Sequence, residues 1–284
     1  MFRSLDGGAT WERRGLPPEG FAYVSEVQAA DATRAWVLDN RGLWRTDDGG
    51  TTWRLLEAPS AGARFIDREH GWSSGCTERA CEDSFRVTSD GGVTWETRPL
   101  PHYGYVQSFL TADLGWGTRP LPEPDEQCPC ESAVMRTTDG GRTWEDVSRN
   151  SFGLSGITFT DARHGWATGY LGQTAASNGI FATTDGGRTW TQEAAIEGYG
   201  YGREFAVAGG RLWLTSSIGF FGGGLRTIIY RREAGGGAPI ISPETGGGGA
   251  AGGGTPMVAA GLAWAALALG AAAAAAGALR RRGA

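Results

Sequence analysis

Short runs that contain apolar residues recur along the chain, and each run is followed by residues that favour turns. Residues 21–27 and 104–110 are two such runs, in which apolar and polar side chains mix at the spacing of a half-buried strand. Gly, Asp, Asn and Ser separate the runs and mark turns. The pattern predicts β-strands joined by short connections, and therefore an all-β domain.

One eight-residue phrase, Ser/Thr-x-Asp-Gly-Gly-x-Thr-Trp, recurs five times, and we call it the DGG turn. The copies occupy residues 4–11, 46–53, 88–95, 137–144 and 183–190. They contain Asp6, Asp48, Asp90, Asp139 and Asp185, and they end at Trp11, Trp53, Trp95, Trp144 and Trp190. Successive aspartates are 42, 42, 49 and 46 residues apart. A period of about 40–45 residues is typical of a four-stranded propeller blade.

A second phrase, Phe-x-Asp-x-x-x-Gly-Trp, lies between the DGG turns, and we call it the Gly-Trp turn. Residues 65–72 and 159–166 match it fully, while residues 109–116 and 29–36 match it in part. Together the two phrases define full units at about residues 20–58, 62–100, 102–149 and 152–197. Residues 204–230 contain three further strand-like runs, and the turn after them has lost its Asp and Trp. We expect a β-propeller of four-stranded blades over residues 20–243, with about six units visible.

Residues 1–19 contain a DGG turn between two short strand-like segments, so the first unit lacks its first two strands. A secretory signal has a basic start, then an apolar stretch and then a small-residue cleavage site. The first residues of the chain do not show this succession. We expect a start upstream that supplies the missing strands and an export signal. The alternative is that this hairpin completes a blade elsewhere in the ring.

The C-terminal segment has a different composition. Residues 244–256 form a Gly-rich linker, and residues 257–279 are 23 residues without a charge, which is long enough for a transmembrane helix. Three arginines open the tail at residues 280–284, so the positive-inside rule places the C-terminus in the cytoplasm and the propeller outside a cell membrane. A buried Ala-rich helix is the alternative interpretation of the span.

Net charge, histidines and cysteines bear on nucleic-acid binding, metal binding and disulfide formation. The net charge is −5, which argues against nucleic-acid binding, and the three His residues form no metal motif. Cys76 and Cys81 fall in one predicted loop between second and third strands, and Cys128 and Cys130 fall in the equivalent loop of the next unit. An even count in an exported domain favours disulfides, within or between these loops, over a zinc site.

The five aspartates are interpreted from their chemistry as turn clamps rather than catalytic acids. Asp stabilises a turn by accepting hydrogen bonds from the backbone that follows it, and Gly-Gly permits positive φ. Trp supplies a large apolar surface that packs between strands. No recurrent carboxylate is then left over for acid–base chemistry.

The DGG turn resembles the Asp-box, or BNR, repeat of sialidases, some endoglucanases, sortilin-type receptors and photosystem II stability and assembly factors. The Gly-Trp turn is most similar to the photosystem II group. The resemblance implies a structural box in which Asp bonds the turn backbone and Trp packs between strands. Residues 242–246 also resemble a sortase sorting signal, with Ser242 where that motif has Leu. That resemblance implies processing between Thr245 and Gly246 and attachment to the cell wall.

The candidate binding residues are unrepeated side chains at or just before first strands, which blade topology places on the face opposite the two turns. They are Tyr23, His102, Tyr103, Tyr105, Tyr199, Tyr201 and Arg203. Exposed Tyr and Arg are favoured in binding hot spots. The alternative is that these aromatic rings only pack blade against blade.

We therefore expect a membrane-tethered, extracytoplasmic and monomeric binding or assembly scaffold, without catalysis or a cofactor. Its ligand would be a protein or a surface glycan. The alternative is an extracellular Asp-box glycoside hydrolase, but the sialidase motif Phe-Arg-Ile-Pro is absent, because residues 2–5 read Phe-Arg-Ser-Leu. Glycoside hydrolysis usually needs two carboxylates that flank the scissile bond.

Overall fold

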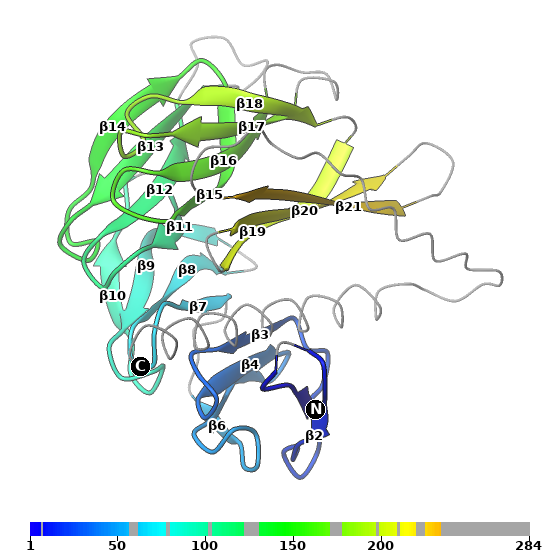
Figure 1. Cartoon of the computed structure of the whole chain (residues 1–284). Helices are drawn as coiled ribbons and strands as arrows, with labels where there is room; N and C mark the ends of the chain where they lie inside the picture. Colours follow the sequence, from blue (N-terminus) through cyan, green and yellow to red (C-terminus); the bar gives the residue numbers. More distant parts are fainter. Residues whose placement is uncertain are drawn as a thin grey trace, which may run out of the picture. The chain divides into compact units, whose positions relative to one another are not determined.

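The regular elements that the structure describes are all β-strands. In the computed structural model, residues 1–6, 8–56, 62–77, 80–101, 104–121, 131–170, 178–196, 199–208, 211–219 and 225–233 are described. The strands are numbered β1 to β21 in Figure 1. The described chain divides into two compact units, the first made of Met1–Ala80 with Phe85–Thr97 and the second of Cys81–Ser84 with the residues from Arg98 onward. The all-β prediction is confirmed.

Four four-stranded sheets, in each of which the chain runs through neighbouring strands in consecutive order, make the fold a β-propeller with four blades. The first blade contains β3 (Glu26–Ala29), β4 (Ala35–Asp39), β5 (Gly42–Thr46) and β6 (Arg54–Leu56). The second contains β7 (Ala63–Phe65), β8 (Gly71–Thr77), β9 (Ala80–Thr88) and β10 (Glu96–Pro99). The third contains β11 (Tyr105–Phe109), β12 (Gly115–Pro120), β13 (Ser132–Thr137) and β14 (Glu145–Asn150). The fourth contains β15 (Gly153–Phe159), β16 (Gly165–Tyr170), β17 (Asn178–Thr183) and β18 (Thr191–Ile196).

Two smaller sheets lie at either end of the strand sequence. β1 (Phe2–Arg3) pairs antiparallel with β2 (Glu12–Arg13), and the first DGG turn joins them. β19 (Tyr199–Ala208), β20 (Arg211–Gly219) and β21 (Leu225–Glu233) form a three-stranded sheet. The prediction of about six units is therefore refined to four complete blades, a two-stranded sheet and a three-stranded sheet. The residues after Glu233, where a fourth strand of the last sheet would follow, lie outside the described part.

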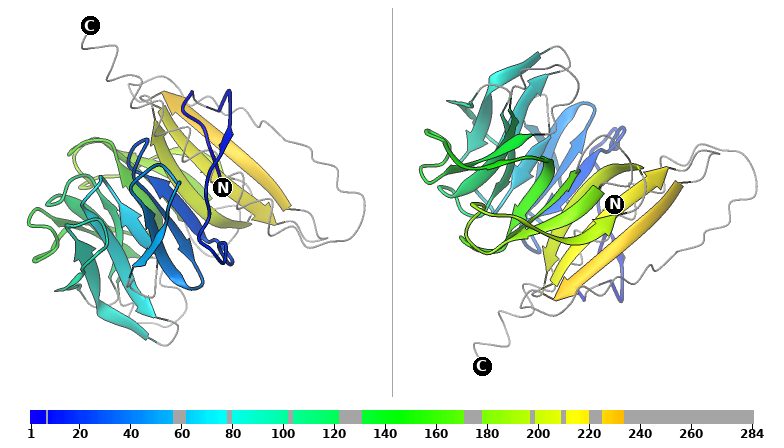
Figure 2. Two further views of the ribbon diagram at one scale, coloured as in Figure 1. Left: turned by 90° about the horizontal axis from the view of Figure 1, so that it is seen from below. Right: turned by 90° about the horizontal axis from the view of Figure 1, so that it is seen from above.

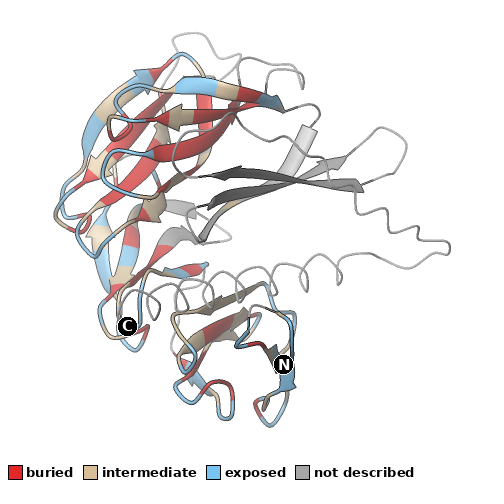
Figure 3. Ribbon diagram, in the orientation of Figure 1, coloured by how far each residue is buried: buried red, intermediate tan, exposed pale blue. Residues whose placement is uncertain are grey.

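Each blade is buried at its middle strands and exposed at its last strand. Figure 3 shows this for β13, which is buried along most of its length, and for β14, which begins at exposed residues. The core of the second unit gathers Trp116, Val134, Ile157, Phe159 and Phe181 from neighbouring blades. Apolar side chains on the facing sides of two blades thus share one layer, which is the usual source of stability in repeat folds.

The sheets repeat their irregularities as well as their strands. The register of β11 against β12 shifts between Val106 and Ser108, and that of β15 against β16 shifts between Ser155 and Ile157. A β-bulge adds a residue and increases local twist. Figure 2 shows the individual sheets, each of them twisted, from two further directions.

The predicted transmembrane span at residues 257–279, the linker before it and the tail after it lie outside the described residues, as do Thr245 and Gly246 of the sortase-like segment. Within the part of the chain that the structure describes, no helix is long and apolar enough to cross a bilayer.

Candidate functional site

The DGG turns are held by the same four hydrogen bonds in every copy. In the last copy, the Thr183 hydroxyl donates to Oδ1 of Asp185 at 2.8 Å and accepts from the Gly187 N–H at 3.0 Å. Oδ1 of Asp185 also accepts from the Thr189 N–H at 2.9 Å, and Oδ2 accepts from the Thr189 hydroxyl at 2.7 Å. Equivalent contacts hold the other four copies. Each aspartate therefore uses both of its oxygens inside its own turn.

These hydrogen bonds keep the carboxylates ionised. Donation from the Thr10 hydroxyl lowers the pKa of Asp6 to about 2, and donation from Thr52 lowers the pKa of Asp48 to about 2. Burial raises the pKa of Asp185, but the hydrogen bonds from Thr189 outweigh it and bring the value to about 2. A general acid in glycoside hydrolysis needs a raised pKa. The DGG aspartates are shifted in the opposite direction.

The depressed pKa values predict a loss of stability in acid. A carboxyl group with a lower pKa in the folded state stabilises the fold above its unfolded pKa, near 3.8, and loses that contribution as the pH falls through the folded value. For Asp48 and Asp185 the folded values are about 2, so the free energy of unfolding should fall between about pH 4 and pH 2. Urea titrations at several pH values measure this slope. Asp185→Asn should make the free energy of unfolding depend less steeply on pH. An unchanged dependence on pH would contradict the role of Asp185 as a turn clamp.

The DGG turn and the Gly-Trp turn of one blade lie side by side. The N–H of Gly186 donates to the carbonyl of Arg163 at 2.9 Å, and the N–H of Gly140 donates to the carbonyl of Asp113 at 2.9 Å. Gly49 and Gly91 make the same contact in the first two blades. Both phrases therefore occupy one edge of each blade, as the blade topology predicts.

The two histidines of the Gly-Trp turns bond within those turns. His164 Nδ1 lies 2.8 Å from Oδ2 of Asp161, and His70 Nδ1 lies 2.9 Å from Oδ2 of Asp67. Each aspartate also accepts the N–H of its histidine, at 2.9 Å and 2.7 Å. Over the described ranges, no group of three His, Cys, Asp or Glu side chains could hold a metal ion.

The tryptophan of a Gly-Trp turn reaches the DGG turn of the following blade. Trp36 Nε1 donates to the carbonyl of Gly91 at 3.0 Å, and its ring stacks on Phe65 with centroids 3.8 Å apart. Trp116 repeats this contact with Gly186 at 3.0 Å and with Phe159 at 3.7 Å. We call this pair of contacts, the hydrogen bond and the ring stack made by Trp36 or Trp116, the lock between blades. The lock was not predicted from the sequence, although the joint recurrence of Phe and Gly-Trp in one phrase was a signal of it.

Tyr23 stands apart from this repeated framework. It lies in the loop of residues 14–25 that precedes β3, its side chain is 88% exposed, and its φ is +52°. No other non-glycine residue in the described ranges has a positive φ. Such a conformation costs of order 1–3 kcal/mol and persists only when the surroundings impose it.

A partly buried ion pair between Asp39 and Arg41 holds this loop. The Asp39 side chain is fully buried, and its Oδ2 accepts from the Ala22 N–H at 3.0 Å and from the Arg41 guanidinium at 3.1 Å. Arg41 also donates to the carbonyl of Gly20 and lies over the Trp44 ring at 5.1 Å. Burial raises the pKa of Asp39, but hydrogen bonds, first that from Ala22, lower it below its usual value. Asp39, like the aspartates of the two repeated turns, therefore has a structural role.

The structure describes only some of the other predicted binding residues. Tyr105 is the first residue of β11, in the second unit, and is 43% exposed. Tyr199, Tyr201 and Arg203 lie within β19, which begins five residues before the strand-like runs expected over residues 204–230. His102 and Tyr103 lie outside the described residues.

The placement of the cysteines corrects one prediction. Cys76 lies in β8 and Cys81 in β9, so these residues belong to strands and not to a loop. The two strands extend further than their sequence suggests, and only residues 78 and 79 separate them. Cys128 and Cys130 lie outside the described residues, and disulfide formation stays a prediction.

The sequence matches no protein-family model and no curated protein. Among solved structures the chain is similar to an ancestral GH74 enzyme, with 13% identity and a TM-score of 0.49 over 88% of this chain and 33% of that one. It is also similar to a protein of unknown function from Dyadobacter fermentans DSM 18053, with 14% identity and a TM-score of 0.44 over 73% and 78% of the two chains. The chain spans about a third of the length of the GH74 enzyme. At these sequence identities and TM-scores, the similarity gives no information about activity.

Proposed function

We propose that this chain is a non-catalytic binding scaffold of the Asp-box type, similar to photosystem II assembly factors in its repeats, without implying a photosynthetic partner. The observation that carries the proposal is the state of the five repeated aspartates. Both oxygens of each carboxylate are engaged inside its own turn, for example with Thr183 and Thr189 at Asp185. The repeated acids therefore build the scaffold, and binding falls to unrepeated residues on loops that the scaffold holds.

Hydrolysis assays test the absence of catalysis. The full chain would be incubated with fluorogenic sialosides, β-glucosides and β-xylosides between pH 4 and pH 7. The proposal predicts release of fluorophore no faster than in protein-free buffer. Turnover that scales with protein concentration and persists in an independently purified preparation would support the alternative, an Asp-box glycoside hydrolase.

The proposed location is the outer face of a cell membrane, with residues 257–279 as the span and residues 280–284 inside. The charge-free stretch and the arginines that follow it support this proposal. Protease added to intact cells should remove the propeller and leave the C-terminal tail protected. Release of the propeller from walled cells only after wall digestion would indicate sortase-like processing at Thr245 instead.

A further inference from the structure

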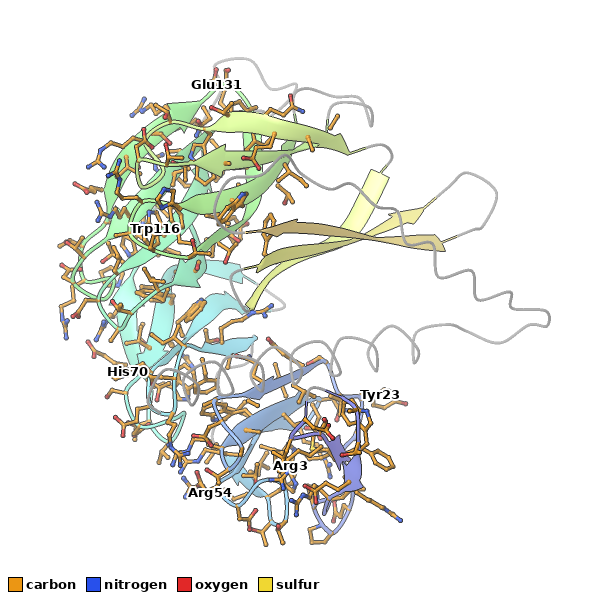
Figure 4. All side chains as sticks on the ribbon, in the orientation of Figure 1. Arg3, Tyr23, Arg54, His70, Trp116 and Glu131 are labelled. Carbon is orange, nitrogen blue, oxygen red and sulfur yellow. The ribbon has the colours of Figure 1, made fainter. Side chains whose placement is uncertain are left out.

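We propose that Tyr23 is an anchor for a polypeptide partner, and that its ring enters an apolar pocket with a basic rim on that partner. The inference rests on the proposed binding function and assigns it to one loop. Tyr23 projects from the loop in Figure 4, and it is the most exposed of the large apolar side chains described. A rigid exposed tyrosine offers a large contact area at a small cost in conformational entropy.

The backbone on both sides of Tyr23 is fixed before any partner binds. Ala22 donates its N–H to Asp39 and accepts from the Asn40 N–H at 3.2 Å. Ser25 donates its N–H to the carbonyl of Leu38 at 2.9 Å. Tyr23 is therefore held in its positive-φ conformation from both sides, so the fold sets the direction in which its side chain leaves the backbone. Pre-organisation of this kind lowers the entropic cost of association.

The ring that precedes Tyr23 helps to hold the loop in place. Phe21 packs edge-on against Trp44 at 6.0 Å and against Trp53 at 5.1 Å. Trp53 ends the second DGG turn, and its Nε1 donates to the carbonyl of Gly15 at 3.2 Å. The loop is thus attached to the repeated framework at residues on either side of its middle.

The polar groups beneath the loop are engaged in holding it. Asp39 uses both carboxylate oxygens, Arg41 uses Nε and both terminal nitrogens, and the Ser25 hydroxyl donates to Leu38. The hydrogen bonds of Asp39 and Arg41 thus run within the protein. The exposed side chains of the loop include Leu16 at 46% and Val24 at 45% beside Tyr23, which favours an apolar partner surface.

Glu19 adds an exposed negative charge to the loop that contains Tyr23. Its side chain is 85% exposed, and one of its oxygens accepts from Arg41 at 3.3 Å. A protruding ring in the same loop as a solvent-exposed carboxylate is complementary to a concave apolar site with a basic residue at its edge. A polypeptide can supply both features, whereas a neutral glycan supplies neither an apolar pocket nor a positive charge.

Photo-crosslinking identifies the partner, and titration with purified components tests the proposal. p-Benzoylphenylalanine would replace Tyr23 in the full chain, expressed in the cells that make it, with the same substitution at Phe2 as the control. Phe2 is 59% exposed in the same unit and belongs to no candidate site. The protein captured at position 23 would then be purified, and its affinity measured for the wild type, Tyr23→Ala, Tyr23→Gly and Phe2→Ala.

The expected result is a loss of affinity of about tenfold or more for both Tyr23 variants and of less than about threefold for Phe2→Ala. Tyr23→Gly removes the backbone strain, so its Tm should not fall and should rise by roughly 2–4 °C. Glu19→Gln should weaken binding chiefly at low salt. Loss of binding in a variant of unchanged or higher Tm separates recognition from folding.

Three results would overturn the inference. They are crosslinking at position 23 that does not exceed crosslinking at position 2, an affinity that Tyr23→Ala leaves unchanged, and Tyr23-dependent binding to a soluble oligosaccharide panel. A partner that binds equally well to Tyr23→Ala would leave the proposed scaffold function intact. Glycoside turnover, in contrast, would remove the proposed function itself.

Discussion

Trp116→Ala is expected to lower the free energy of unfolding by about 3–5 kcal/mol, which is the usual cost of removing a buried tryptophan. The Trp116 side chain is fully buried, stacks on Phe159 at 3.7 Å and donates to the Gly186 carbonyl at 3.0 Å. The substitution therefore leaves a cavity between two blades and an acceptor without its donor. Urea denaturation followed by tryptophan fluorescence measures the loss.

Two further variants show whether the lock between blades accounts for the loss of stability in Trp116→Ala. Trp116→Phe keeps an aromatic ring for the stack but removes the hydrogen bond, and we expect it to cost clearly less than the alanine variant. Trp11→Ala removes a tryptophan that is 43% exposed and bonds only its own turn, at Gly8. Its cost should be about 1 kcal/mol or less. Equal costs for Trp11→Ala and Trp116→Ala would contradict the lock.

Gly186→Ala is expected to destabilise the fold by about 2–4 kcal/mol, through backbone strain and a steric clash together. Gly186 has a φ of +77°, and a Cβ there would lie 2.9 Å from the carbonyl oxygen of Ala162. That oxygen belongs to the Gly-Trp turn that the DGG turn contacts. The clash would push apart two turns that the Gly186 N–H now joins.

Gly20→Ala is the matched control for this prediction. Gly20 has a similar φ of +69°, but nothing lies within 4 Å of a Cβ at that position. The control should therefore show backbone strain alone, of about 1 kcal/mol. If the two variants unfold at the same urea concentration, the close contact between the turns contributes nothing to stability.

The blade boundaries could be predicted from sequence because each repeated phrase determines a turn with its own residues. Thr183, Asp185 and Thr189 close the last DGG turn through hydrogen bonds among themselves. The four full units expected at residues 20–197 accordingly match the strands from Glu26 to Ile196. Strand ends were harder to predict, since β8 and β9 extend through Cys76 and Cys81, where the sequence suggests a loop.

The contacts between blades and the conformation of Tyr23 depend on residues that are far apart in the sequence. The lock joins Trp36 to Gly91 and Trp116 to Gly186, at separations of 55 and 70 residues. Tyr23 could be chosen as an exposed aromatic, but its positive φ follows from Asp39 holding Ala22 from 17 residues away. An isolated Tyr has no preference for that conformation, so only the folded chain reveals the strain.

The central claim is that the repeated aspartates are turn clamps and not catalytic acids. The most direct test is the pKa of the Asp185 carboxyl group, followed by the carbon-13 shift of its side chain in an NMR titration. The hydrogen bonds from Thr189 and Thr183 predict a value of about 2. A value at or above the ordinary 3.8 would contradict the clamp, and a value well above it would mark Asp185 as a candidate general acid.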